Sequence, residues 1–251
     1  MIFSKIDIDK AKDFYHKAKP FPFVVIDDFL DENIAELIWK DLAYLMPNKG
    51  WNFYDSPLEK KFTNDKWELI PDVTRCVLAF LNTSMTTSLL EEITNISGLL
   101  PDPSIRGAGI SYVLPGGKLD LHSDRQIHPK LNVYRRLNLL IYFNKNWSDN
   151  YGGSLELWNS DVTKCEHKIS PIFNRMVLFE TNDHSYHGHP DPLTCPIGMA
   201  RKALSLYYWT STIPEDFKIN EMSTDFRGRP GENNPELEAL REQRRKAIPK
   251  K

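Results

Sequence analysis

The sequence predicts a mainly β protein with flanking helices, in which a β-sandwich or jelly roll follows a helical N-terminal part. Seven short runs of alternating or apolar residues lie between residues 109 and 210, separated by Gly, Pro, Asn and Asp. Helical spacing of apolar residues is found before Gly98. The β-rich part shows no alternation of strands with helices, which argues against a parallel α/β sheet.

Three helices are expected in the N-terminal part. The run FPFVVIDDFLD (21–31) reads as a strand followed by acids, and either Asp28 or Asp31 is placed to cap a helix over about 32–46. Apolar residues at helical spacing predict two further helices between 72 and 98, ending near Gly98.

The remaining segments are less regular. Residues 2–19 suit either a short strand or a helix, and residues 51–70 are polar and aromatic without a sustained period, which predicts mostly loop. The strand pattern ends at Ile213. A last helix is expected at Pro235–Ala247, with Asn234 as its cap, and its basic residues favour a solvated face over a contact with an acidic partner.

Length and composition suit a single domain spanning 1–251, with helical support over about 1–100, a β core over about 104–212 and a tail over 213–251. The net charge of −2 gives no general attraction to nucleic acid or membranes. No apolar run is long enough to span a bilayer, and no secretory signal is evident. Three scattered cysteines predict reduced thiols and a cytoplasmic location.

The first candidate metal ligands form a His-x-Asp pair, His122-Ser123-Asp124. Such a pair says little alone, since chance produces one about as often as not, and a second pair exists at His189-Pro190-Asp191. His122 follows an alternating strand, where residues two apart point to the same face and can reach one ion. The second pair lies between prolines, which predicts a loop, so we interpret it as a chance match.

A third ligand has to come from another strand. The apolar run RMVLFET is followed by His184, His187 and His189, of which His187 is favoured, while the other two stay open as alternatives. Two imidazoles and one carboxylate form the facial triad of non-haem iron(II) oxygenases, which leaves coordination positions open. A structural zinc site would normally use four ligands and is often rich in cysteine, which does not fit this chain.

With these residues in view, the chain resembles the iron(II)/2-oxoglutarate-dependent dioxygenases, specifically their prolyl 4-hydroxylase-like branch. FPFVVIDDFLD resembles the strand and helix start that open these domains. RRLNLLIYFNKNW followed by GGSLELW is similar to the central strand pair, FET before His187 to the distal-histidine segment, and RKALSLYYW to the strand that carries the basic anchor. The resemblance implies a double-stranded β-helix (a jelly roll of the cupin type) with N-terminal helices packed on one sheet.

The resemblance also implies roles for individual residues. His122, Asp124 and His187 match the iron ligands. Arg201, fourteen residues after His187, matches the anchor of the distal carboxylate of 2-oxoglutarate, a role that suits a guanidinium fork, and Lys202 is its nearest competitor. Co-substrate contacts are further implied for three residues: Tyr142, Tyr112 and Asn138. The chain departs from the family pattern in two places: His189 replaces an apolar residue, and Ser205 follows the anchor two positions late.

The implied reaction converts 2-oxoglutarate and O₂ to succinate and CO₂ while an unactivated C–H bond is hydroxylated, with Fe(II) as cofactor and ascorbate as support. The substrate expected is a prolyl residue of a protein or a small metabolite. A non-catalytic cupin-like metal-binding protein and a zinc or manganese enzyme on the same scaffold are the alternatives. Loops 125–135 and 145–152 are expected to form a basic and aromatic rim with these residues: Arg125, His128, Lys130, Arg135, Arg136, Trp147 and Tyr151.

Overall fold

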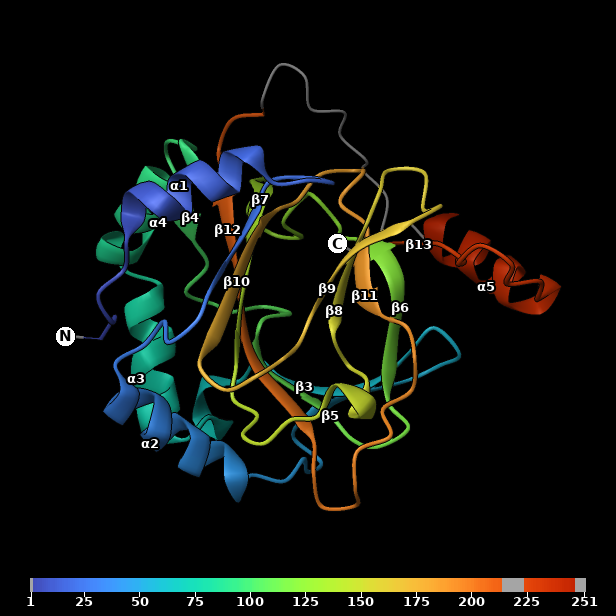
Figure 1. Ribbon diagram of the computed structural model, residues 1–251, viewed down its shortest axis with the longest axis horizontal. Coiled ribbons are helices and arrows are strands. Elements are labelled where there is room, and N and C mark those ends of the chain that lie inside the picture. The colour runs from blue at the N-terminus through green and yellow to red at the C-terminus, as the bar shows by residue number, and fades with distance from the viewer. Residues whose placement is uncertain (1, 214–223, 247–251) are drawn as a thin grey trace.

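A computed structural model describes residues 2–213 and 224–246 of the chain. Its centre is one curled sheet whose paired strands are all antiparallel, with order β1-β10-β7-β12-β5-β3-β6-β11-β8-β9 (Figure 1). Strand β13 pairs with β6, β2 with β3 and β4 with β12. The predicted class, mainly β with flanking helices around a jelly-roll core, is confirmed.

The strands of the curled sheet occur along much of the chain. The bounds are β1 (Phe23–Ile26), β2 (Asn52–Asp55), β3 (Glu59–Asn64), β4 (Leu100–Pro101), β5 (Gly109–Val113), β6 (Lys118–Ser123), β7 (Tyr134–Tyr142), β8 (Leu155–Trp158), β9 (Cys165–Ile169), β10 (Arg175–Glu180), β11 (His187–His189), β12 (Arg201–Thr210) and β13 (Asp225–Phe226).

In the part of the chain that the structure describes, helices α1 to α4 cover one side of the sheet, and α5 lies beyond β13 on the opposite side (Figure 1). The two helices predicted between residues 72 and 98 are confirmed. The segment 2–19, for which the sequence suited either a strand or a helix, contains a helix. The bounds are α1 (Ile8–Lys17), α2 (Glu32–Ala43), α3 (Asp72–Leu81), α4 (Ser84–Thr94) and α5 (Pro235–Lys246), with short 3₁₀ turns η1 (Trp67–Leu69) and η2 (Asp149–Tyr151).

Two helix starts follow the predicted capping. Asp31 accepts hydrogen bonds from the amides of Asn33 and Ile34, which identifies it rather than Asp28 as the cap of α2. Asn234 accepts from the amide of Leu237 at the start of α5. Of the predicted range for this helix, Ala247 lies outside the described residues.

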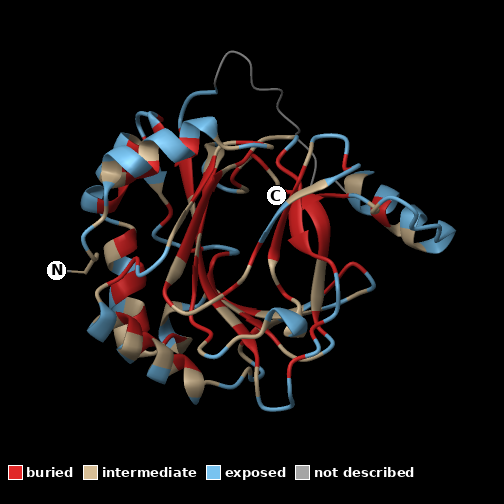
Figure 2. Ribbon diagram, viewed as in Figure 1, coloured by how far each residue is buried: buried red, intermediate tan, exposed pale blue. Residues whose placement is uncertain are grey.

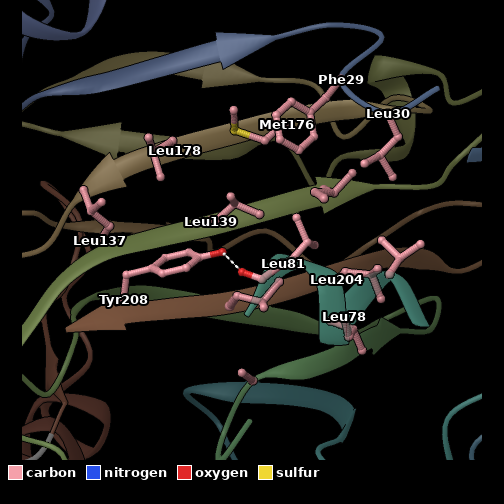
Figure 3. Packing of buried hydrophobic residues seen from close by; sticks show 14 of the residues in the cluster. Phe29, Leu30, Leu78, Leu81, Leu137, Leu139, Met176, Leu178, Leu204 and Tyr208 are labelled. Carbon is pink, nitrogen blue, oxygen red and sulfur yellow. Dashed lines mark hydrogen bonds between the residues drawn. The ribbon is translucent and has the colours of Figure 1, made fainter. Parts of the chain in front are cut away.

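The central strands separate an apolar face from a polar one by their two-residue period. On β7, Leu137, Leu139 and Ile141 are buried in the large cluster that also contains residues of α2, α3 and α4. Figure 3 shows Leu137 and Leu139 in this cluster together with Leu81 and Tyr208, and the Tyr208 hydroxyl donates to the Leu81 carbonyl at 2.8 Å. The intervening residues of β7, Asn138 among them, therefore face the inside of the curled sheet.

The segment 51–70 was predicted to be mostly loop, and this prediction is wrong. It contains β2, β3 and η1, and β3 pairs with both β5 and β6. On one face of this strand, Glu59, Lys61 and Thr63 line the polar interior, and the other face carries Lys60, Phe62 and Asn64. Neither face is continuously apolar, so the strand does not alternate apolar with polar residues. Hydrophobic periodicity detects a strand only where one of its faces is apolar.

The C-terminal tail is attached to β6 through β13 and through buried charges. Arg241 of α5 is 2% exposed and donates to Asp120 on β6 at 2.9 Å and to Glu232 at 2.8 Å. Lys118 bonds the other oxygen of Asp120 at 2.8 Å. Most other residues of α5 are exposed (Figure 2), so the helix has a solvated face, as predicted, and is held at its buried arginine.

No helix within the described ranges is long and apolar enough to cross a membrane. All three cysteines (Cys76, Cys165 and Cys195) are free thiols, as predicted.

The contact between α5 and β6 predicts a stability effect. Replacing Arg241 with alanine leaves Asp120 buried with one of its two cationic partners removed, and we expect the free energy of unfolding to fall by about 3 kcal/mol in urea titrations followed by circular dichroism. Lys246→Ala, which breaks an exposed pair with Glu242 on the same helix, is the matched control and should cost less than about 0.5 kcal/mol. Equal effects of the two substitutions would contradict the role of Arg241.

Candidate metal centre

Two neighbouring strands place the candidate ligands together. Strand β11 pairs with β6 in a register that sets His187 directly opposite His122. Asp124 follows the last residue of β6 and lies two residues beyond His122, on the same side of the extended chain. The predicted pair and the distal histidine, 65 positions apart in sequence, therefore meet at one point inside the curled sheet.

The three side chains have the spacing of ligands around one ion. Their donor atoms all lie within 4.8 Å of one another. The Nε2 atom of His122 lies 3.6 Å from Oδ1 of Asp124, and the Nε2 atom of His187 lies 3.6 Å from Oδ2 of the same carboxylate. Both histidines are buried. In the part of the chain that is described, these residues form the one group of three or more such side chains with metal-ligand spacing.

Backbone carbonyls fix which nitrogen of each imidazole is free. Nδ1 of His122 lies 2.8 Å from the Asp120 carbonyl, and Nδ1 of His187 lies 2.9 Å from the Ser185 carbonyl. Because a carbonyl only accepts, each Nδ1 carries the proton and each Nε2 presents its lone pair to the centre. This second hydrogen bond on the far nitrogen is the usual support of a metal-binding histidine.

The charge states also suit a divalent cation. Burial lowers the pKa of His122 to about 3, and His187 reinforces the effect. Burial likewise lowers the pKa of His187, against the opposing charge of Asp124. For Asp124 burial acts to raise the pKa, but Arg135 and the two histidines outweigh it, so its pKa lies below the usual range. Two neutral imidazoles and one carboxylate face the centre at neutral pH.

The Asp124 carboxylate is held by two further residues. Nη1 of Arg135 lies 3.1 Å and Nδ2 of Asn138 lies 2.5 Å from Oδ2 of Asp124. Asn138 was predicted to contact the co-substrate, and the structure places its amide on the ligand carboxylate. Its own Oδ1 is buried and has no hydrogen-bond partner among the described residues. Asn138 therefore orients Asp124 and still has an acceptor for another group.

An inner cavity of about 120 Å³ extends from the triad into the curled sheet. Arg201 lines it, with 4% of its surface exposed. Nε of Arg201 donates to the Gly153 carbonyl at 2.6 Å, and Nη2 donates to the hydroxyl of Tyr142 at 3.1 Å. The structure therefore brings Arg201 and Tyr142 together, as the resemblance implied. Lys202 lies 5.5 Å from the Tyr112 ring and does not line the inner cavity.

The second glycine of the GGSLELW motif, Gly153, lies against Arg201 in a conformation that favours glycine. A Cβ at this position would lie 2.7 Å from Leu193 and 3.0 Å from Arg201, and its φ of +74° is unfavourable for other residues. A side chain here would push against the arginine.

Tyr112 is not brought to the centre. Its side chain is buried in the apolar cluster between sheet and helices, where it meets Trp51 edge-on at a centroid distance of 6.0 Å. Its neighbour on β5, Ser111, lines the inner cavity instead. The alternation of a strand allows only one of these two adjacent residues to face inward, so the expected approach of Tyr112 to the metal end of the co-substrate does not fit its position.

The second His-x-Asp pair does not form a metal group. Asp191 is exposed and pairs with Arg229 at 2.8 Å, while His184 is exposed and lies 3.4 Å from Asp183. His189 belongs to β11 rather than to a loop, and it lines the inner cavity near Arg201. Its Nδ1 has no hydrogen-bond partner among the described residues.

Several residues of the site were missed by sequence reasoning. Lys61 and Thr63 reach the cavities from β3, which was not recognised as a strand. Phe226 of β13 packs against His122 at a centroid distance of 5.4 Å. Among the predicted rim residues, His128 is buried beside Asp102, and Trp147 packs in an apolar cluster. No short-range signal marks these placements.

Comparisons with known proteins agree with this geometry. Residues 108–209 match the family model described as the 2OG-Fe(II) oxygenase superfamily. Among curated proteins, none matches the chain in sequence.

Three solved structures illustrate the similarity of fold. A prolyl-4-hydroxylase from Pseudomonas putida has a TM-score of 0.54 at 15% identity, covering 80% of this chain and 98% of that chain. A prolyl 4-hydroxylase from Phytophthora capsici has a TM-score of 0.56 at 17% identity, covering 97% and 78%. HygX from Streptomyces hygroscopicus, solved with nickel and 2-oxoglutarate bound, has a TM-score of 0.51 at 14% identity, covering 87% and 94%.

Residues 108–209, which form the core of the curled sheet, thus match the 2OG-Fe(II) oxygenase superfamily, in agreement with the superfamily predicted from the sequence. The fold around this core is that of prolyl 4-hydroxylases, which agrees with the predicted branch.

If the triad holds the metal, substitution of one of its residues should abolish metal binding, and substitution of a residue outside it should not. Titration of the wild-type protein with Mn(II) under anaerobic conditions should raise its unfolding free energy, by about 2.7 kcal/mol at a metal concentration 100-fold above Kd. His122→Ala should abolish this gain because it removes one of three ligands. Asp191→Ala, which removes the carboxylate of the second His-x-Asp pair, is the control and should keep the full gain. Loss of the gain in Asp191→Ala alone would contradict the assignment.

Proposed function

We propose that the chain is a non-haem iron(II) and 2-oxoglutarate-dependent dioxygenase that hydroxylates an unactivated C–H bond. The overall reaction converts 2-oxoglutarate, O₂ and the substrate to succinate, CO₂ and the hydroxylated substrate. One oxygen atom of O₂ enters succinate and the other enters the hydroxyl group of the product. One observation carries this proposal: the guanidinium of Arg201 is buried, faces the cavity next to the triad, and has no carboxylate partner among the described residues. A buried cation without a counterion calls for an anionic ligand.

The donor set of His122, Asp124 and His187 fits Fe(II). Its mixed nitrogen and oxygen ligands suit this ion, and three protein ligands leave positions for the co-substrate and O₂. When bound, iron supplies the activation of O₂ that is coupled to the decarboxylation of 2-oxoglutarate. The backbone carbonyls of Asp120 and Ser185 hold the two imidazoles in the required tautomer, and Asn138 and Arg135 hold the carboxylate.

The inner cavity fits 2-oxoglutarate. Arg201 would bind the distal carboxylate through charge-assisted hydrogen bonds, with the Tyr142 hydroxyl beside it. Apolar walls formed by Leu140, Leu155 and Phe179 exclude water from the carbon chain. Asn138 Oδ1 and His189 Nδ1 are the buried atoms that still have hydrogen-bonding capacity there. Ascorbate would keep the iron reduced between turnovers.

The two alternatives make no use of Arg201. A non-catalytic cupin-like metal-binding protein, or a zinc or manganese enzyme on this scaffold, needs no buried cation one cavity away from the metal. We also propose a cytoplasmic location, which the three unpaired thiols support because reduced cysteines persist in that compartment.

The reaction is tested with apo-protein supplied with Fe(II), 2-oxoglutarate, ascorbate and air, together with prolyl peptides and small metabolites as candidate substrates. Succinate should form in the wild type and not in Asp124→Ala. Failure of the wild type both to bind 2-oxoglutarate and to release succinate would refute the proposal and favour the alternatives.

The anchor is tested by Arg201→Met, for which we expect the KM for 2-oxoglutarate to rise by roughly 10- to 100-fold, because a charge-assisted contact of about 1.5–3 kcal/mol is lost. The affinity for Mn(II) should stay unchanged. Lys202→Met removes the neighbouring charge, which lies outside the inner cavity, and serves as the matched control. A larger rise in KM for the Lys202 variant would reverse the assignment.

A further inference from the structure

A second, outer cavity of about 260 Å³ adjoins the inner cavity at His122 and Asp124. It shares His122, Asp124, Lys61 and Thr63 with the inner cavity, so a molecule bound there lies next to the metal ligands. Its walls combine aromatic side chains with basic ones. The aromatic residues are Tyr54, Tyr207 and Phe226, and the basic residues are Lys61, Arg125, Arg135 and Arg244.

The acidic residues of this cavity are already engaged. Glu59 pairs with Lys61 at 3.2 Å and with Arg244 at 2.9 Å. Asp124 pairs with Arg135 and is a ligand of the triad. Among the described residues, no carboxylate lies within ion-pair distance of Arg125, and its buried Nε has no hydrogen-bond partner. Within residues 2–213 and 224–246, the outer cavity therefore has an excess of positive charge that no carboxylate neutralises.

The two arginines at the centre of this excess lie close enough to influence each other. Burial lowers the pKa of the Arg125 guanidinium, and repulsion from Arg135 and Arg106 lowers it further. Arg135 is held in place by the Tyr207 ring, whose centroid lies 3.7 Å from its guanidinium carbon, and by Trp209 at 5.0 Å. Its buried Nε also lacks a partner among the described residues. Two neighbouring guanidinium groups with unused N–H donors form a site for an oxyanion.

We infer that the outer cavity binds the primary substrate through an anionic group, a carboxylate or a phosphate, held by Arg125 and Arg135. This inference rests on the proposed function and names the substrate class of the same site. The volume of the cavity fits a small molecule, and the three aromatic residues provide apolar contact for its carbon skeleton. An uncharged prolyl segment would leave Arg125 without a counterion. The substrate is therefore a small anionic metabolite.

The inference is tested by binding to protein loaded with Mn(II) and 2-oxoglutarate under anaerobic conditions. The probes are phenylacetate and phenyl phosphate, the uncharged phenylacetamide, and the uncharged capped peptide acetyl-Ala-Pro-Ala-amide. Broadening of probe proton signals by Mn(II) reports binding near the metal and gives Kd. At least one anionic probe should bind ten times or more tightly than both uncharged probes. The stronger anion identifies carboxylate or phosphate as the preferred group.

Variants locate the binding group. Arg125→Gln should weaken the anionic probe at least tenfold and leave the Kd for 2-oxoglutarate unchanged, while Arg125→Lys should restore part of the affinity. Lys130→Gln removes an exposed charge from the same loop, outside the cavity, and should have no effect. Binding of the capped peptide with no preference for anions, or equal losses in the Arg125 and Lys130 variants, would overturn the inference. Failure of the wild type to bind 2-oxoglutarate would instead overturn the proposed function.

Discussion

The site depends on one strand pairing, that of β11 with β6. This pairing sets His187 opposite His122. The Nδ1 atom of each histidine contacts the carbonyl of the residue two positions earlier in the chain, Asp120 or Ser185. Gly188 lies between the two histidines of β11, and a Cβ there would approach the carbonyls of Leu119 and Asp120 to 2.8 Å. Close contact of the two backbones is therefore a condition for the triad, and only glycine permits it.

The central strands of the sheet have an apolar face toward the helices and a polar face toward the triad. Leucine and isoleucine side chains of β7 and β12 pack against α2, α3 and α4, while Asn138, Arg201 and Ser205 point inward. The stabilising apolar contacts lie between the outer face of the sheet and the helices. The polar residues of the inner face are therefore positioned by apolar packing that does not include the candidate ligands. Burial then sets the charge states, since it keeps both ligand histidines neutral, and Arg135 keeps Asp124 ionised.

Two adjoining cavities meet at His122 and Asp124, and different arginines line them. Arg201 serves the inner cavity, and Arg125 with Arg135 serves the outer one. The tail closes the same region from outside, because Phe226 packs on His122 and Arg241 binds Asp120, whose carbonyl orients that histidine. The basic residues of α5 are thereby linked to the metal ligands as well as to solvent.

The sequence by itself determined the fold class and the three candidate ligands, and the family resemblance pointed to Arg201 as a candidate anchor, because strand alternation and local spacing depend on neighbours along the chain. It failed at β3 and at Tyr112. A strand with two polar faces has no hydrophobic period, and which of two adjacent residues faces inward depends on the register with a distant strand. The tertiary structure alone decided that Asn138 binds Asp124, that His189 lies in the inner cavity, and that Arg125 and Arg135 meet at the outer one. These are contacts between segments far apart in sequence, for which no local pattern exists.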